Sequence, residues 1–239
     1  MILYGINPVL EALRAGRVRE VRVGERRDER LRGLLELAAA GGVRVRRVSM
    51  ETLERDSHRG VHQGVVADLE EGRNYGIDEL VRGDSGPPLL VVLDGIEDPH
   101  NLGAIIRTAD AAGADGVIVQ SRRSAARGGV AAKASAGAVA HVKVAEVVNI
   151  ARALEELKKA GVWTVGLAGD VPTAYDAVDF RLSTAIVLGA EGAGLRRLVR
   201  ERCDRVASIP MLGHVGSLNV SVAAGVALFE AVRQRKTTS

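Results

Sequence analysis

Short apolar runs alternate with amphipathic segments in the chain from Leu89 onward. The near-continuous apolar runs, such as LLVVLDG, predict strands that are buried on both faces, as in a parallel sheet. They occupy residues 89–95, 116–120, 162–168, 184–190 and 205–210. Helical patterns lie between and after them, near 101–112, 127–138, 146–160, 194–202 and 217–235. This alternation predicts an α/β fold with a doubly wound parallel sheet.

Residues 1–70 carry a second and smaller α/β pattern. Apolar and polar residues alternate in three segments that we predict to be strands, at 18–23, 43–48 and 64–69. The pair Asn7-Pro8 predicts the start of a first helix, with Asn7 as its cap. Asp28 is expected to open a second helix, and Ser49 to cap a short third one.

A stretch of different composition separates the two patterns. Residues 71–88 are polar and rich in glycine, and they end in two prolines. Few packed contacts are expected in such a stretch. We therefore predict three parts, which are a small domain at 1–70, a linker at 71–88 and a larger domain at 89–239.

The charge balance is slightly basic. The chain contains 33 Lys and Arg residues against 30 Asp and Glu residues, which gives a formal net charge of +3. This balance is compatible with a nucleic-acid partner but does not establish one. Aromatic residues make up only 3% of the chain, so stacking of bases on aromatic side chains is not expected. If RNA binds, contacts between arginine and phosphate should dominate.

Several classes of protein do not fit the composition. Cys203 is the only cysteine and the five histidines are scattered, so we predict neither a disulfide framework nor a metal site. No apolar run approaches the roughly 20 residues of a membrane-spanning helix. The N-terminal sequence lacks the basic flank and apolar core of a signal peptide. We therefore expect a cytoplasmic protein that has no metal and no membrane association.

The first segment with candidate chemistry is DGIEDPHNLGAIIRTADAAGADGVIV, at 94–119. A strand ends there, a polar turn follows, and a helix is predicted to begin near Asn101. Ligand sites in open α/β sheets form at such carboxyl ends of strands. Asn101 and Arg107 lie six residues apart, so they need not share a helix face. If Asn101 lies in the turn before the helix, both side chains can still reach one cleft at the end of the strand. The alternative is that Asn101 caps the helix and Arg107 is a solvated surface residue.

The second segment is IVLGAEGAGL, at 186–195. Gly189, Gly192 and Gly194 would permit a ligand to approach the backbone closely. Their spacing, G-x-x-G-x-G, differs from the dinucleotide-binding pattern G-x-G-x-x-G. Glu191 lies among these glycines, where it is either functional or merely solvated.

The third segment is IPMLGHVGSLNVSVAAGVALFEAVRQR, at 209–235. A strand ends at Ile209, a glycine-rich loop follows, and Ser217 or Asn219 is expected to cap the next helix. Small residues on most faces of this helix permit close packing against a ligand or a second subunit. A tightly packed core helix is the alternative, but it does not explain the polar residues at the mouth of the helix.

Together, in this order and spacing, the three segments resemble the motifs of the SpoU (TrmH-like) family of RNA ribose 2′-O-methyltransferases. The resemblance covers residues from about 89 to the C-terminus. YGINPVLEALR (4–14) and HRGVHQGVVA (58–67) resemble the N-terminal substrate-binding domain of members that methylate a guanosine ribose in 23S ribosomal RNA.

The resemblance implies properties that the spacing alone does not show. The larger domain would contain a trefoil knot, an exception to the rule that chains are unknotted. S-adenosyl-L-methionine would bind in the knot, and two copies would form a homodimer through the knotted region. The N-terminal domain would be similar to ribosomal protein L30e. Structured RNA, most specifically 23S ribosomal RNA, would be the substrate.

The resemblance also assigns roles to individual positions. The family's cofactor contacts fall on Gly189, Ile209, Met211, Gly213 and Leu218. Its catalytic and substrate-side positions fall on Asn101, Arg107, Glu191, Ser217 and Asn219. A basic stretch after the strand at 116–120 is a candidate for contacts to RNA, through Arg122, Arg123, Arg127 and Lys133.

The role of Arg107 stays open between two interpretations. It is the family's candidate base for the ribose hydroxyl, yet an arginine is protonated at any ordinary pH. The alternative is that its planar fork grips the phosphate beside the target ribose, which we favour on physical grounds.

Three other functions compete with this interpretation. A non-catalytic RNA-binding protein of the same fold would not need Asn101, Arg107, Glu191 and Asn219. A nicotinamide-dependent dehydrogenase would need the G-x-G-x-x-G pattern, which is absent. Transfer RNA as the substrate is disfavoured by the additional N-terminal domain.

Overall fold

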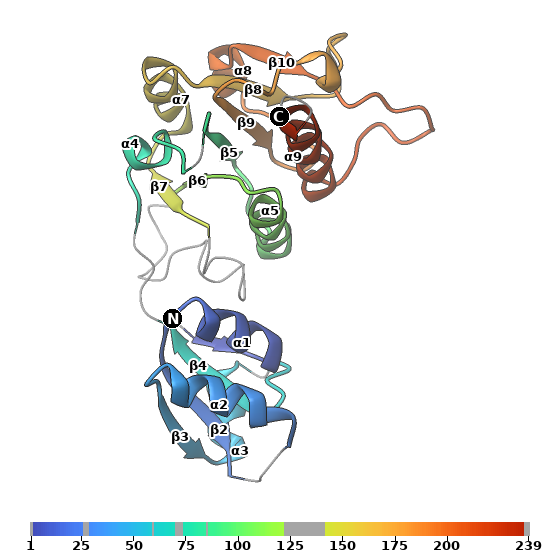
Figure 1. Ribbon diagram of the computed structural model, residues 1–239. Coiled ribbons are helices and arrows are strands. Elements are labelled where there is room, and N and C mark those ends of the chain that lie inside the picture. The colour runs from blue at the N-terminus through green and yellow to red at the C-terminus, as the bar shows by residue number, and fades with distance from the viewer. Residues whose placement is uncertain are drawn as a thin grey trace. The chain divides into compact units, whose positions relative to one another are not determined.

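The computed structural model describes residues 2–25, 29–58, 60–69, 74–84, 86–121 and 142–236 (Figure 1). The described residues fall into two compact units. Unit 1 comprises the described residues up to Leu69, and unit 2 comprises those from Asn74 onward. Each unit has its own hydrophobic core.

Unit 1 is built on a mixed four-stranded sheet with the order β1-β4-β2-β3. Its strands are β1 (Ile2–Tyr4), β2 (Val18–Gly24), β3 (Arg44–Val48) and β4 (Val65–Leu69). Strand β4 is antiparallel to β1 and β2, whereas β2 and β3 are parallel. Helices α1 (Ile6–Arg14) and α2 (Arg32–Ala40), the latter after a 3₁₀ turn at Glu29–Leu31, pack on the core. Helix α3 (Met50–Asp56) contacts β2 and β4.

The start of α1 differs from the sequence prediction. The helix begins at Ile6, so Asn7 is not its cap. Gly5 precedes the helix with a φ of 95°, a backbone conformation that favours glycine. The backbone N–H of Ile6 donates to Gln63 Oε1 at 2.9 Å, so a residue far along the chain takes the place of a local cap. The prediction for Ser49 is confirmed, because its side chain accepts from the Thr52 N–H at 3.3 Å.

Unit 2 is built on a six-stranded sheet with the order β10-β8-β9-β5-β6-β7, and every pair is parallel. The strands are β5 (Leu89–Asp94), β6 (Gly116–Gln120), β7 (Val144–Val147), β8 (Trp163–Leu167), β9 (Thr184–Gly189) and β10 (Arg205–Ala207). All of β5 is buried, which explains its continuous apolar run. The predicted α/β class with a parallel sheet and a separate N-terminal unit is confirmed.

Helices cover both faces of this sheet (Figure 1). Helices α5 (Pro99–Ala111) and α9 (Val220–Lys236) pack against each other, and α9 also contacts β9. Helices α4 (Ile77–Leu80), α7 (Ile150–Lys159) and α8 (Arg197–Arg202) lie on the opposite face, where they share a core with alternate residues of the central strands. A short 3₁₀ turn at Tyr175–Ala177 lies between β8 and β9.

The predicted linker at 71–88 includes a short helix, α4, whose apolar residues pack in the core of unit 2. Leu80 of α4 is completely buried in the core of unit 2. It lies so close to Gly116 that a Cβ at that glycine would meet the Leu80 side chain at 2.6 Å. Asp115 fixes the end of the stretch by accepting from the N–H groups of Asp84 and Leu89. The polar composition of this stretch did not reveal that it contains an amphipathic turn, whose apolar residues pack in the core of unit 2.

One predicted helix began too early. Residues 144–147 form the edge strand β7, whereas the sequence pattern placed a helix from 146. Helix α7 begins at Ile150 because Asn149 caps it, accepting from the Arg152 N–H at 3.1 Å. The helix predicted at 127–138 lies outside the described residues.

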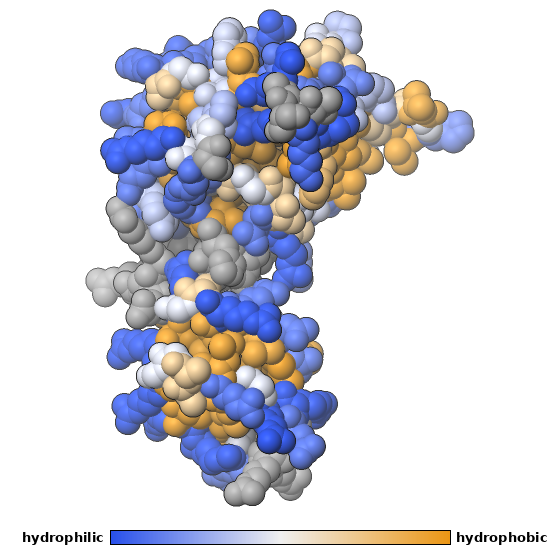
Figure 2. Space-filling view, viewed as in Figure 1, coloured by the Kyte–Doolittle hydropathy of each residue, from blue (hydrophilic) through white to orange (hydrophobic). Residues whose placement is uncertain are grey.

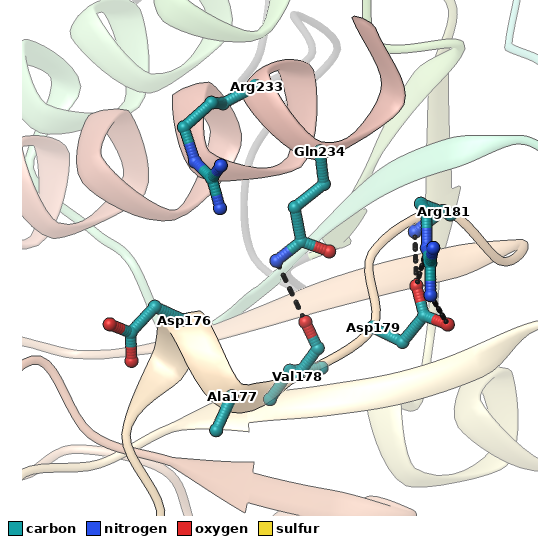
Figure 3. A pocket seen from close by; sticks show the side chains of 7 residues that line it. All are labelled: Asp176, Ala177, Val178, Asp179, Arg181, Arg233 and Gln234. Carbon is teal, nitrogen blue, oxygen red and sulfur yellow. Dashed lines mark hydrogen bonds and ion pairs between the residues drawn. The ribbon is translucent and has the colours of Figure 1, made fainter. Parts of the chain in front are cut away.

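The carboxyl-terminal end of α9 is fastened to the segment before β9. Gln234 accepts from the Phe180 N–H at 2.9 Å and donates to the Val178 carbonyl at 3.0 Å. The guanidinium of Arg235 donates to the carbonyls of Phe180, Pro87, Pro88 and Leu182. Figure 3 shows the shallow polar pocket beside these contacts, where Arg233 and Gln234 of α9 face the turn that carries Asp176 and Asp179.

Within the described part of the chain, no helix is long and apolar enough to cross a membrane. The same residues contain no group of three or more His, Cys, Asp or Glu side chains that could hold a metal ion.

Candidate functional site

The turn after β9 is a closed loop that presents Glu191 at the carboxyl edge of the sheet. Ala190 and Gly194 exchange backbone hydrogen bonds at 3.1 and 2.8 Å. Gly192 and Gly194 have φ angles of 73° and 65°, so the turn requires glycine at both positions. Glu191 therefore has an exposed and fixed position in the turn.

Gly189 is needed for a different reason from the one that the sequence suggested. A Cβ at this position would lie 2.1 Å from the carbonyl carbon of Gly194 and 2.2 Å from the nitrogen of Leu195. The close approach at Gly189 is thus to the chain's own backbone, and it allows the turn to fold back over the end of β9.

Three of the five predicted catalytic residues meet through hydrogen bonds. The side-chain amide of Asn219 donates to Asn101 Oδ1 at 3.0 Å and to Glu191 Oε1 at 2.5 Å. Its oxygen accepts from the Ser221 N–H at 2.9 Å, so Asn219 also caps the start of α9. The three side chains come from the start of α5, the turn after β9 and the start of α9, and they join these loops at one point.

The interpretation of Asn101 as a helix cap is wrong. Helix α5 is capped by Asp98, whose side chain accepts from the His100 N–H at 3.0 Å. Asn101 instead lies within the first turn of the helix, where it is only 7% exposed. Its buried amide oxygen has Asn219 as a partner, which is what a buried polar group requires.

Arg107 and Ser217 are not joined to this cluster. Both side chains are exposed, and neither side chain forms a hydrogen bond or ion pair with another described residue. Arg107 lies six residues after Asn101 on α5, which places it about 9 Å further along the helix axis and on another face. An exposed guanidinium without an internal partner is available for an anion from outside, such as a phosphate.

The loop between β10 and α9 contains four of the predicted cofactor positions. Ile209, Met211 and Leu218 are partly buried, whereas Gly213 is exposed. None of residues 209–218 hydrogen-bonds to another described residue. The loop therefore offers apolar side chains together with unused backbone N–H and C=O groups, which is the combination that an adenosine needs. The chemistry of these residues fits the expected cofactor.

A cavity of about 510 Å³ opens at the same edge of the sheet. It lies between the ends of β5 and β6 and the turn after β9. Its lining residues Leu102 and Ala190 are sequence neighbours of Asn101 and Glu191. Its lining includes Asp94, Leu102, Gln120, Ala193 and Arg196 but none of the five predicted cofactor positions.

The sequence interpretation missed the polar groups of this cavity. Asp94 is completely buried and pairs with Arg196, and Gln120 accepts from the same guanidinium at 2.8 Å. The sequence could have indicated Asp94, because it is the one charged residue of the buried strand LLVVLD and a buried charge needs a partner. Nothing local pointed to Arg196, which is 102 positions away.

The four basic residues proposed for RNA contacts, Arg122, Arg123, Arg127 and Lys133, lie outside the described residues.

Two family models match the chain. The SpoU rRNA Methylase family matches residues 88–229. The model named RNA 2′-O ribose methyltransferase substrate binding matches residues 2–75. The two matches fall on unit 2 and unit 1, respectively.

Individual relatives agree with these matches. The 23S rRNA (guanosine-2′-O-)-methyltransferase RlmB of Ralstonia nicotianae is 48% identical and covers 98% of this chain and 96% of its own. The SpoU methyltransferase AviRb from Streptomyces viridochromogenes, in complex with the cofactor AdoMet, superposes with a TM-score of 0.80. The two are 28% identical, and the match covers 99% of this chain and 91% of AviRb. The A. aeolicus TrmH/SpoU tRNA modifying enzyme has a TM-score of 0.59 and 30% identity, and it covers 68% of this chain and 82% of its own. The protein thus belongs to the SpoU rRNA methylase family.

Proposed function

We propose that this protein transfers a methyl group from S-adenosyl-L-methionine to the 2′-hydroxyl of a guanosine ribose in 23S ribosomal RNA. The observation that carries the proposal is the hydrogen-bonded cluster of Asn101, Glu191 and Asn219. It joins three loops at the edge of a parallel sheet where ligand sites form. The relative from Ralstonia nicotianae, which bears this activity in its name, matches nearly the whole chain.

When bound, the cofactor supplies an electrophilic methyl group for attack by the ribose oxygen. The chain's own contribution is to bind and orient the reactants. Ile209, Met211 and Leu218 form apolar walls, and the unused backbone groups of their loop bind the polar edges of the adenosine. Orientation of this kind contributes roughly 7–11 kcal/mol to the lowering of a reaction barrier.

Arg107 acts on the RNA side of the site in this proposal. Its guanidinium, which has no partner among the described residues, grips the phosphate beside the target ribose, and this contact fixes the 2′-oxygen in line with the methyl group. Asn101, Glu191 and Asn219 hold the loops in register, while Ser217 stands exposed at the mouth of the site. A role for Arg107 as the base that removes the hydroxyl proton is the competing interpretation, and it predicts a different dependence of the rate on pH.

Unit 1 supplies RNA affinity in this proposal. Its match to a substrate-binding model supports this role. Ribosomal RNA is favoured over transfer RNA because the tRNA-modifying neighbour leaves about a third of this chain unmatched. We also propose that the protein acts in the cytoplasm. The trefoil knot and the similarity of unit 1 to L30e stay predictions.

We further propose that the enzyme is a homodimer that pairs through α9 and the loop before it. Val222 and Phe229 of α9 are each 50% exposed, and Leu212 in the loop is 99% exposed. Figure 2 shows hydrophobic side chains on the projecting loop that Figure 1 places before α9. Apolar side chains gathered in this way are typical of an interface. Light scattering should give about twice the chain mass of 25.2 kDa, and a monomer at micromolar concentration would contradict this assembly.

The proposed activity is tested with the purified protein, radiolabelled S-adenosyl-L-methionine and 23S ribosomal RNA that lacks modifications. We expect label on RNA, located by mass spectrometry on the ribose of a guanosine. Calorimetry should show binding of S-adenosyl-L-methionine or S-adenosylhomocysteine and no binding of NAD. Cofactor binding without transfer to any RNA would favour a non-catalytic RNA-binding protein, and NAD binding alone would overturn the proposal.

A further inference from the structure

The cavity beside the catalytic cluster has the architecture of a binding site in its own right. Its walls include the apolar side chains of Leu93, Leu102, Val119 and Leu195. Its polar lining comprises Glu97 and Arg197 together with a hydrogen-bonded group formed by Arg196, Asp94 and Gln120. An apolar hollow with a small number of fixed polar groups is the usual form of a site for a flat organic ligand.

Arg196 is held in a fixed orientation. Its backbone N–H donates to Asp94 Oδ2 at 2.8 Å, and its Nε donates to Asp94 Oδ1 at 2.6 Å. Its Nη2 also contacts Asp94 and donates to Gln120 Oε1 at 2.8 Å. The amide of Gln120 is itself fixed, because its nitrogen donates to the Val148 carbonyl at 3.0 Å. The plane of the guanidinium is therefore set before any ligand arrives.

One edge of this guanidinium stays unused. The Nη1 group of Arg196 makes no hydrogen bond with any described residue, and the side chain is 53% exposed. Asp94, which is completely buried, already balances the positive charge. A neutralised and planar donor suits neutral acceptor atoms that lie side by side. Guanine presents such a pair in O6 and N7, whereas adenine presents one acceptor and one donor on the same edge.

The cavity is also in the right place relative to the catalytic cluster. Leu102 follows Asn101 directly, and Ala190 and Ala193 flank Glu191 in the turn after β9. The cavity and the cluster therefore lie at the same edge of the sheet and are formed by the same two loops, the start of α5 and the turn after β9. Proteins that recognise RNA by its sequence mostly bind unstacked bases, so a pocket for the base of the target nucleotide would serve its recognition.

We propose that this cavity receives the base of the target guanosine and that Arg196 recognises its O6 and N7 atoms. Asp94 and Gln120 are positioning residues that fix the guanidinium. The inference rests on the proposed function, because it names the recognition element of the same site.

The first test uses the wild-type enzyme and synthetic RNA with an altered base at the methylated position. 7-Deazaguanine lacks N7, 2-aminopurine lacks O6, and hypoxanthine keeps both atoms but lacks the 2-amino group. We expect kcat/KM to fall about 5- to 150-fold with 7-deazaguanine and with 2-aminopurine. Hypoxanthine should be methylated at nearly the rate of guanine. A loss with hypoxanthine as large as that with 7-deazaguanine would overturn the proposal, because a different edge of the base would then be read.

The second test combines the same RNAs with Arg196→Lys. Lysine keeps a positive charge beside the buried Asp94, which protects the fold, but it lacks the free Nη1 edge. The variant should bind S-adenosylhomocysteine normally and lose most of its discrimination between guanine and 7-deazaguanine. Arg152→Lys is the matched control, because Arg152 is an exposed arginine of α7 that pairs only with Glu156. It should keep the wild-type discrimination.

The outcomes separate this inference from the proposed function. If the wild-type enzyme methylates no guanosine at all, the proposed function fails. If it methylates guanosine and Arg196→Lys still discriminates against 7-deazaguanine as the wild type does, only the assignment of Arg196 fails.

Discussion

The two units of this protein have the same kinds of element but place their polar groups differently. Among its described residues, unit 2 buries six polar or charged side chains, which are Asp94, Asn101, Thr164, Thr184, Ser208 and Glu230. Among the described residues of unit 1, only Ser57 is in that class. The arginines of unit 1 instead lie mostly on its surface, and four of the five residues of its edge strand β3 are exposed.

The different placement of polar side chains in the two units fits different roles for them. A buried polar group is costly unless it is hydrogen-bonded. Two of these six, Asp94 at the end of β5 and Asn101 at the start of α5, lie at the carboxyl edge of the sheet, where ligand sites form. Exposed arginines cost little and act through their number, which suits a large, negatively charged partner. This contrast supports the proposed division of roles, in which unit 1 contributes RNA affinity and unit 2 carries out the reaction.

The largest effect is expected from Arg107, whose side chain pairs with none of the residues that the structure describes. Arg107→Ala should lower methyl transfer about 100-fold or more, while the fold and cofactor binding survive. The measurement is single-turnover transfer, with calorimetry for S-adenosylhomocysteine as the control. Near-normal transfer would remove Arg107 from the mechanism.

Arg107→Lys separates the two roles of this residue. If Arg107 grips phosphate, lysine should weaken RNA binding and slow transfer at every pH, because it lacks the planar fork. If Arg107 is the base, lysine should keep substantial activity that rises with pH, since an amine loses its proton more readily than a guanidinium. Transfer rates across a pH series, together with RNA binding at fixed salt, distinguish the outcomes.

A smaller effect is expected at Asn219, which links the cluster to α9. Asn219→Ala removes the bonds to Asn101 and Glu191 and the cap of α9. We expect transfer to fall about 10- to 100-fold and the free energy of unfolding to fall by about 1 kcal/mol. Ser221→Ala is the control, because it removes only a hydroxyl that donates to Asn219. Equal losses of transfer in the two variants would show that the bonds from Asn219 to Asn101 and Glu191 contribute nothing of their own.

Removal of unit 1 tests the division of labour directly. A chain that begins at Asn74 keeps the core of unit 2 and should bind S-adenosylhomocysteine with unchanged affinity. Its RNA affinity should fall about 10-fold, and the salt dependence of binding should weaken because phosphate contacts are lost. Lower cofactor affinity with unchanged RNA affinity would reverse the assignment of the two units.

The smallest effect concerns the interior of unit 2. Burial raises the pKa of the Cys203 thiol to about 12. The thiolate is then scarce at pH 8, so a thiol reagent should modify the folded protein much more slowly than the unfolded chain. Equal rates in native and denaturing buffer would show that this part of the interior is open to solvent.

The fold of unit 2 was readable from the sequence because its strands are apolar on both faces. Strand β6 was predicted with its observed limits, 116–120. Strand β1 was missed because three residues carry too little periodicity, and the start of α1 was misplaced because its partner is Gln63. Local patterns contain no information about a cap supplied from 57 positions away.

The candidate site was only partly readable. The family motifs named Asn101, Glu191 and Asn219, but only the structure shows that Asn219 joins the other two. Helical periodicity could not reveal that Asp94 pairs with Arg196, because a parallel sheet brings distant loops to one edge. Residues that act through such long-range pairs cannot be identified from local sequence patterns before the strand order is known.

The proposed methyl transfer to 23S ribosomal RNA is tested most directly by comparing ribosomal RNA from cells with and without this protein. Mass spectrometry of nuclease fragments identifies ribose methylation by mass and position. We predict that one guanosine of 23S ribosomal RNA loses its 2′-O-methyl group when the gene is deleted. The methyl group should return with the wild-type protein but not with Arg107→Ala. An unchanged set of methylated riboses in 23S ribosomal RNA, or a loss confined to transfer RNA, would contradict the account.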